Sequence, residues 1–318
     1  MKRLLFFFCA ALLLSSAAFA RPRQDRGNKN AVSVVTTVFP SYDFVREIAG
    51  DTVNLSLLLP PGAESHSFEP TPRDIIQIQN SDLFIYVGGE SETWVERILD
   101  SVDSYKNGKL KVISLMDMVE VVEEEIVEGM EEEEEEAGGE EEAEYDEHVW
   151  TSPRNAGLIV HAISEALCQA DSANAAFYRR NAQDYQAKLD ELDGAFQTVV
   201  NGARRKTIIF GDRFPFRYFA DDYGLSYYAA FPGCSTETEC SAATVAFLVD
   251  KVKNENIPVI FHIELSNEKI ADTISEATGA KKLLLHACHN VSKQDMDRKV
   301  SYLELQRGNV DRLREALR

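Results

Sequence analysis

Short apolar runs rich in β-branched residues alternate with amphipathic helical patterns along the first part of the chain. Apolar runs of this length, bounded by Gly, Pro and Asn, are typical of buried strands. Their alternation with helices predicts an α/β fold with a mainly parallel sheet. Ser41 is the expected cap of the first helix. The expected strands are residues 31–40, 53–62, 82–89 and 109–115, and the expected helices are residues 41–50, 71–81 and 91–102.

The same alternation returns after residue 203, which predicts a second α/β unit of similar construction. No short-period repeat is visible, so the two halves share a pattern rather than a motif. The expected strands of this half are residues 206–211, 225–231, 258–265 and 281–287. Its expected helices are residues 216–224, 241–256, 267–279 and 302–317.

A long helix is predicted between the two halves, after a shorter one at residues 155–169. Apolar residues recur there at steps of three and four, which places them on one helical face. A continuous helix over residues 173–200 would be about 40 Å long at 1.5 Å per residue. It is a candidate spine between two lobes. The stripe consists of Tyr178, Ala182, Tyr185, Leu189, Leu192, Phe196 and Val199.

The N-terminus has the order of a secretory signal peptide. Two basic residues precede a short apolar run, and Ala-Phe-Ala precedes Arg21, so cleavage is expected after Ala20. The run is short for a bilayer-spanning helix of about 20 residues. Cys9 lies inside the run rather than after it and is not expected to carry a lipid. We therefore expect an exported, diffusible protein.

Most of the net charge of −20 comes from one segment, residues 120–147, which contains 16 Glu, one Asp and no Lys, Arg or His. The rest of the chain is nearly neutral, so nothing indicates nucleic acid binding. A long run of like charges is usually solvated and disordered. The expected organisation is a signal peptide at 1–20, a flexible N-terminus at 21–30, an N-terminal lobe at 31–172 that contains the acidic disordered loop 120–147, a linking helix at 173–202 and a C-terminal lobe at 203–318.

Five of the six histidines lie in or beside segments that follow expected strands. Open α/β sheets bind ligands at the carboxyl ends of their strands, and imidazole and carboxylate groups are common zinc ligands. His161 lies in a helix and is read as structural. The strand-end candidates are His66, His148, His262, His286 and His289, with Asp212 and Glu264.

Two histidine-containing segments resemble those of the zinc- and manganese-binding proteins that feed bacterial ABC importers, the ZnuA- and TroA-like solute-binding proteins of cluster A-I. GAESHSFEPTPRDI at 62–75 is similar to their G-x-x-x-H-x-aromatic-E-x-T-P-x-D segment, and DEHVWTSPRNA at 146–156 to D-x-H-x-W-x-S-P. The long helix and FRYFADDYGL at 216–225 are also similar. The resemblance covers nearly all of the mature chain. It implies two α/β lobes joined by a rigid helix, with one metal between them.

The resemblance places His66 and His148 on the first two ligand positions. The third position, usually His or Glu, falls on Arg213, which cannot bind a metal because it is not deprotonated in proteins. Asp212 replaces it if the loop shifts by one residue; alternatively, Arg213 pairs with a carboxylate beside the site.

The fourth position aligns with His286, or with His289 if the register slips. Glu264 is expected either to bind the metal or to orient a ligand. The predicted set is therefore His66, His148 and His286 with one carboxylate, from Glu264 or Asp212. Three imidazoles favour Zn²⁺, whereas a second carboxylate would favour Mn²⁺ or iron. Because His ligands must be neutral, binding is expected to weaken below about pH 6.5.

The resemblance implies a protein that is not an enzyme and that captures a divalent metal, as a monomer, in the periplasm of a two-membrane bacterium. It would deliver the metal to an inner-membrane ABC permease and its ATPase. Two other classes are alternatives. A secreted zinc hydrolase would use Glu264 as its general base, but no HExxH motif supports it. A surface adhesin would bind basic partners through the acidic segment.

The polyglutamate run precedes His148 and is expected to gather divalent cations weakly. Cys234 and Cys240 are close enough in sequence for a disulfide, but two free thiols remain an alternative. The residues expected to collect metal are Glu131, Glu132, Glu133, Glu134, Glu135 and Glu136.

Overall fold

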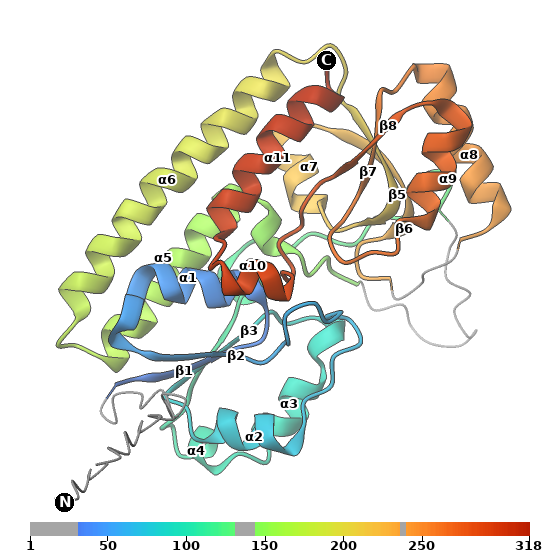
Figure 1. Cartoon of the computed structure of the whole chain (residues 1–318). Helices are drawn as coiled ribbons and strands as arrows, with labels where there is room; N and C mark the ends of the chain where they lie inside the picture. Colours follow the sequence, from blue (N-terminus) through green and yellow to red (C-terminus); the bar gives the residue numbers. More distant parts are fainter. Residues whose placement is uncertain (1–30, 131–143, 236–239) are drawn as a thin grey trace, which may run out of the picture.

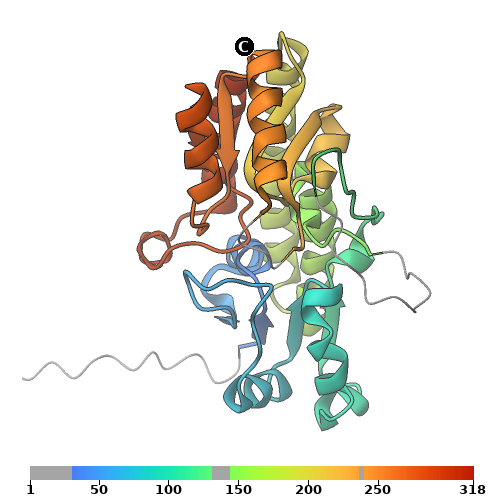
Figure 2. The ribbon, with the colours of Figure 1, turned by 90° about the vertical axis from the view of Figure 1, so that its right-hand side faces the viewer.

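The computed structural model describes residues 31–130, 144–235 and 240–318. They form two lobes, each built on a four-stranded sheet whose neighbouring strands are all parallel, with helices on both faces. Figures 1 and 2 show the lobes one above the other, and Figure 1 shows the long helix α6 (Ala175–Asn201) running beside both. The predicted α/β class is confirmed.

The N-terminal sheet has the strand order β2-β1-β3-β4. Successive side chains of a strand face opposite sides of the sheet. Accordingly, Val34 packs in the core that contains α1 and α5, while Val35 packs in a separate cluster with α2 and α3. The strands are β1 (Ser33–Thr36), β2 (Asn54–Leu57), β3 (Leu83–Tyr86) and β4 (Lys111–Ser114).

The C-terminal sheet repeats this order as β6-β5-β7-β8. Its strand β5 is longer than predicted and continues through Asp212 and Arg213, with an irregularity in its pairing to β6 between Phe210 and Arg213. Both residues therefore lie at the carboxyl end of a central strand. The strands are β5 (Thr207–Phe214), β6 (Ser226–Pro232), β7 (Val259–His262) and β8 (Lys281–Leu284).

Helix starts follow local capping chemistry. Thr71 and Asp74 form a reciprocal capping box at the start of α2. The prediction that Ser41 caps the first helix is wrong: α1 begins after Val38, with Pro40 in its first turn, and the Ser41 hydroxyl donates to the Val38 carbonyl. The N-terminal helices are α1 (Phe39–Ala49), α2 (Pro72–Gln79), α3 (Trp94–Leu99), α4 (Asp103–Lys106) and α5 (Pro153–Ala170).

The helices of the second half cover both faces of its sheet, with α8 and α9 on one face and α7 on the other. The last helix, α11, returns to pack along α6, as Figure 1 shows. The second half contains α7 (Arg217–Tyr223), α8 (Ala242–Glu255), α9 (Lys269–Thr278), α10 (Lys293–Asp297) and α11 (Tyr302–Ala316).

The connecting helix α6 spans Ala175–Asn201, and every residue of the predicted apolar stripe is buried. Tyr185 packs edge-on against Phe44 of α1 in the N-terminal lobe. Phe196 packs against Phe219 of α7 in the C-terminal lobe, with ring centroids 4.8 Å apart. One hydrophobic core therefore runs from lobe to lobe along α6.

The described flanks of the acidic segment pair with each other, whereas the sequence predicted a solvated run from residue 120 onward. Glu124 N–H donates to Glu144 O at 2.8 Å, and Asp146 N–H donates to Val122 O at 3.0 Å. The first flank also contacts the C-terminal lobe, where Lys251 pairs with Glu128 at 3.0 Å. The glutamates at 131–136 lie outside the described residues.

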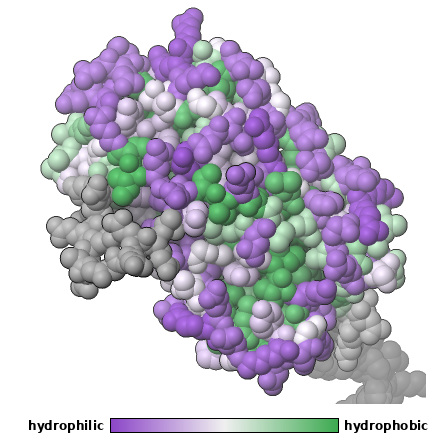
Figure 3. All heavy atoms as spheres, turned by 180° about the vertical axis from the view of Figure 1, so that it is seen from behind, coloured by the Kyte–Doolittle hydropathy of each residue, from purple (hydrophilic) through white to green (hydrophobic). Residues whose placement is uncertain are grey.

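Polar and apolar residues are unevenly distributed over the back face of the molecule. Figure 3 shows hydrophilic residues over both ends of the back face, with apolar residues in patches between them. No described helix combines the length and the apolar character that a bilayer-spanning segment requires. Cys234 carries a free thiol, so the disulfide considered for Cys234 and Cys240 is not formed.

Candidate metal centre

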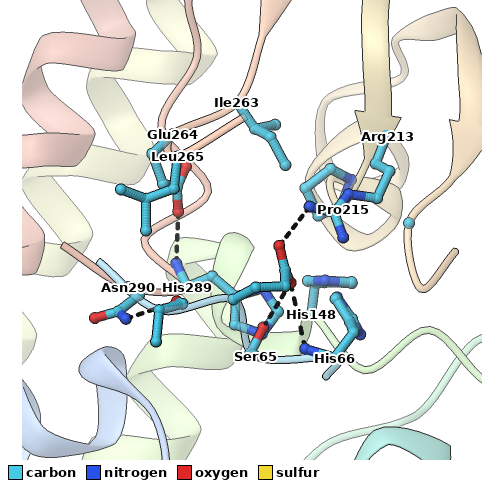
Figure 4. A pocket seen from close by; sticks show the side chains of 13 residues that line it. Ser65, His66, His148, Arg213, Pro215, Ile263, Glu264, Leu265, His289 and Asn290 are labelled. Carbon is cyan, nitrogen blue, oxygen red and sulfur yellow. Dashed lines mark hydrogen bonds and ion pairs between the residues drawn. The ribbon is translucent and has the colours of Figure 1, made fainter. Parts of the chain in front are cut away.

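Three histidines from separate segments converge where the lobes meet (Figure 4). One ring nitrogen from each of His66, His148 and His289 lies within 4.8 Å of the others. The ring centroids are 4.9 to 5.5 Å apart. Zinc binds imidazole nitrogen at about 2.0–2.1 Å, so small side-chain movements would let one ion contact all three rings.

His148 is held in one orientation by the carboxylate two residues before it. Asp146 Oδ1 lies 3.0 Å from His148 Nδ1 and accepts the His148 backbone N–H at 2.7 Å. The other ring nitrogen, Nε2, is buried and has no hydrogen-bond partner among the described residues. A buried polar atom without a partner is costly, and a bound metal would satisfy it. The buried and unpartnered Nε2 of His148 is therefore suited to bind a metal ion, and the carboxylate–histidine pair is typical of metal sites.

His66 lies on the loop after β2, and the opposite lobe holds this loop in place. Gly62 N–H donates to Val291 O at 2.9 Å. The buried Asn290 side chain donates to Pro60 O at 2.8 Å and to Ala63 O at 2.9 Å. These bonds connect the loop of His66 directly to the segment that carries His289, so the two rings approach each other without relying on their own contacts.

His289 follows β8, on a loop that Glu264 organises through its backbone. Glu264 Oε1 accepts the His289 N–H at 2.8 Å, and Oε2 accepts the Ala287 N–H at 2.7 Å. Glu264 lines the same pocket as the three histidines. Both Glu264 oxygens therefore accept hydrogen bonds from the loop of His289. This arrangement corresponds to the orienting role, one of the two roles expected for Glu264.

His286 does not join the group. Its Nδ1 accepts the Cys288 N–H at 2.9 Å, and its backbone N–H donates to Asn309 Oδ1 at 2.9 Å. Between the two histidines the chain turns at Cys288, which has a φ of 63°, a value uncommon for a residue with a side chain. This turn brings His289, the slipped-register alternative, to the group in place of His286.

Asp212 also lies apart from the group, because its carboxylate accepts backbone N–H groups from Ile263 at 3.1 Å and from Arg213 at 2.9 Å. The Arg213 side chain lines the pocket. Its Nη2 forms an ion pair with Glu64 Oε2 at 2.8 Å, and its Nη1 donates to Ser235 O at 3.2 Å. Of the two sequence expectations for Arg213, pairing with a carboxylate is the one that the geometry shows.

Sequence reasoning did not single out Asp146 or Glu64. Asp146 had a signal, since it is the Asp of the D-x-H segment at 146–148. Glu64 had none, because its partner Arg213 lies 149 positions away.

Burial and neighbouring charges set the protonation of the three rings. Burial, and then the charge of His148, lowers the pKa of His66 to about 3 despite the nearby Glu64. Burial and the neighbouring histidines hold the pKa of His289 well below its usual value. Burial alone lowers the pKa of His148, but the charge and hydrogen bond of Asp146 outweigh it and raise the pKa. His66 and His289 are therefore neutral donors at neutral pH.

Known proteins are similar to this chain in both sequence and fold. A family model described as zinc-uptake complex component A, periplasmic, matches residues 34–316. The chain is 36% identical over 317 residues to the high-affinity zinc uptake system protein ZnuA of Bacillus subtilis, covering 98% of this chain and 97% of that protein. It is 31% identical to the zinc-binding lipoprotein AdcA of Streptococcus pneumoniae, covering 99% of this chain and 61% of that longer protein.

Solved structures agree with this assignment. The metal-dependent lipoprotein YcdH from Bacillus subtilis superposes with a TM-score of 0.75 at 32% identity, covering 90% of this chain and 100% of that one. The Zn(II)-bound ZnuA-like domain of Streptococcus pneumoniae AdcA gives a TM-score of 0.73 at 30% identity, covering 90% and 99%. The chain therefore belongs to the family of periplasmic zinc-uptake components, as the two histidine segments predicted.

Proposed function

We propose that this protein captures Zn²⁺ outside the cytoplasm and delivers it to an ABC importer. The observation that carries this proposal is the convergence of His66, His148 and His289 around a buried His148 Nε2 that has no partner among the described residues. Family membership and the zinc-binding relatives support the same cargo.

The donor set favours zinc over manganese. Mn²⁺ prefers carboxylate, carbonyl and water ligands, whereas imidazole suits Zn²⁺. The two candidate carboxylate ligands from the sequence, Glu264 and Asp212, already accept hydrogen bonds from backbone N–H groups. Three imidazoles thus supply the main donors.

The members of this family are metal-transport components rather than enzymes. The hydrolase alternative needs Glu264 as a general base, yet both of its oxygens accept hydrogen bonds from the loop of His289. The adhesin alternative rests on the acidic segment 120–147, of which residues 131–143 lie outside the described residues.

The remaining assignments follow from this role. Residues 1–20 act as the export signal, with cleavage after Ala20, and the mature protein works as a monomer in the periplasm. Its partners are an inner-membrane ABC permease and the ATPase of that importer. The family description as a periplasmic component supports the location.

Metal analysis of the purified mature protein tests the site. The wild type should hold one equivalent of zinc after gel filtration, and His66→Ala, His148→Ala and His289→Ala should each lose most of it. His286→Ala is the matched control, because His286 lies on the same loop as His289 but outside the group. One equivalent of zinc in all three site variants would refute the proposed ligand set.

A further inference from the structure

The fourth side of the candidate site is occupied by a charged pair that joins the two lobes. Arg213, at the end of β5, pairs through Nη2 with Glu64 Oε2 at 2.8 Å, and Glu64 belongs to the loop of His66. Figure 4 shows Arg213 reaching in from the side opposite His66, with its ion pair drawn as a dashed line. Both residues line the same pocket as the three histidines.

The two oxygens of Glu64 are held differently. Oε2 has the short contact with the guanidinium. Oε1 has only long contacts, from the His66 backbone N–H at 3.3 Å and from the Ser65 hydroxyl at 3.4 Å. These are weak hydrogen bonds by distance. One carboxylate oxygen is therefore free to exchange weak partners for a stronger one.

Arg213 is fixed more firmly than its partner. Its side chain is 13% exposed and is also anchored through Nη1 to Ser235 O, whereas the Glu64 side chain is 40% exposed. When a cation arrives, Glu64 is thus the group that can rotate. Its oxygens lie outside the group of three nitrogens, so a side-chain rotation is required.

We propose that Glu64 is the fourth zinc ligand and that Arg213 is the residue that positions it. One Glu64 oxygen binds the ion while the other keeps its contact with the guanidinium. Three imidazoles and one carboxylate then close a four-coordinate site. The positive charge of Arg213, which by itself would repel Zn²⁺, is offset by the carboxylate that it presents. This inference rests on the proposed zinc function and specifies its ligand set.

Zinc affinity in single and double variants tests the proposal, using chelator competition on the full mature chain. Glu64→Gln should raise the Kd at least about tenfold, because a ligand is lost. Arg213→Gln should weaken binding when Glu64 is present and strengthen it in the Glu64→Gln background, where the guanidinium is an unpaired charge beside the ion. Arg213→Lys should recover most of the affinity that Arg213→Gln loses.

Co²⁺ provides a readout of coordination that does not depend on affinity. The wild type should show the intense visible absorption of a four-coordinate site, and Glu64→Gln should change its intensity and position. Glu96→Gln and Arg73→Gln remove the same charges from exposed positions on α3 and α2 and should leave both the Kd and the spectrum unchanged.

Two results would overturn the inference while leaving the zinc function intact. One is a Glu64→Gln variant whose zinc Kd and Co²⁺ spectrum are the same as those of the wild type. The other is an effect of Arg213→Gln that is equal in both backgrounds. By contrast, a wild-type protein that binds no zinc would refute the proposed function itself.

Discussion

The two lobes have the same strand order but contribute different chemistry to the site between them. The N-terminal lobe supplies two imidazoles and a carboxylate on its own short segments, with Asp146 oriented directly onto the His148 ring. The C-terminal lobe supplies one imidazole and an arginine. Its nearby carboxylate, Glu264, holds loop backbone and lies 3.3 Å from the ring of His286, which is not part of the group. Equivalent topology therefore fixes where the site lies, while loop geometry decides which atoms reach it.

The largest expected effect tests whether the lobes are one cooperative unit. Phe196→Ala removes a fully buried ring of α6 that packs on the C-terminal lobe, and Tyr185→Ala does the same on the N-terminal side. Each should cost about 3–5 kcal/mol in the free energy of unfolding. Both variants should unfold in a single transition with a lower denaturant midpoint than the wild type, measured by fluorescence and circular dichroism.

The exposed Lys188→Ala on the same helix is the control and should change stability little. Two separate transitions, only one of which responds to each variant, would show that the lobes unfold independently.

A second prediction concerns Glu92, a buried acid of the N-terminal lobe. Burial raises the pKa of Glu92 from 4.5 to about 7. The folded state then holds its proton where the unfolded state has lost it, so the contribution of Glu92 to stability is present below pH 4.5 and is lost as the pH rises through 7. The full loss is about 3 kcal/mol at 1.36 kcal/mol per pKa unit.

Glu92→Gln, which stays neutral, should therefore be more stable than the wild type at pH 8 and nearly equal to it at pH 4.5. Thermal melts of the metal-free proteins at both pH values measure this difference. The exposed Glu96→Gln should show no such pH dependence, and an equal difference at both pH values would contradict the pKa shift.

A third prediction compares the two supporting carboxylates, Asp146 and Glu264. It begins with Asp146, which contacts the ring of His148. Asp146→Asn can no longer provide a negative charge to His148 Nδ1, although it can still accept the backbone N–H. Zinc affinity should fall about 10- to 100-fold. Isothermal titration against a competing chelator measures it, and unchanged affinity would mean that Asp146 has no part in orienting the ring.

The smallest effect is expected for the carboxylate of the C-terminal lobe. Glu264→Gln keeps one oxygen that can accept an N–H from the loop of His289, so zinc affinity should fall less than tenfold. The order of the two variants is the informative result. A larger loss for Glu264→Gln than for Asp146→Asn would indicate that Glu264 itself binds the metal.

Local patterns in the sequence were enough for the fold class and for half of the candidate site. Period-two and period-3.6 patterns depend on near neighbours, so the strands and the buried stripe of α6 were readable. His66 and His148 lie within distinctive segments, and the structure brings both into the group.

The other half depends on contacts between residues far apart in the chain. The choice between His286 and His289 follows from the left-handed turn at Cys288 and from the hold of Glu264 on the loop. The acidic flank appeared solvated because the residues that neutralise it, such as Lys251, come more than 100 positions later. Patterns within a single sequence do not indicate which distant residues contact each other.

The continuous core along α6 has a consequence for how the site is emptied. Swinging the lobes apart would expose apolar side chains to water, at about 25 cal/mol for each Å² uncovered. Moving the loop at residues 60–66, which is exposed or half-buried, breaks only a few hydrogen bonds to the opposite lobe. The segment at 287–291 is part of the buried core. The mechanically soft part of the candidate site is thus the loop that carries His66, and an acceptor that pulls on this loop meets far less resistance than one that bends the spine.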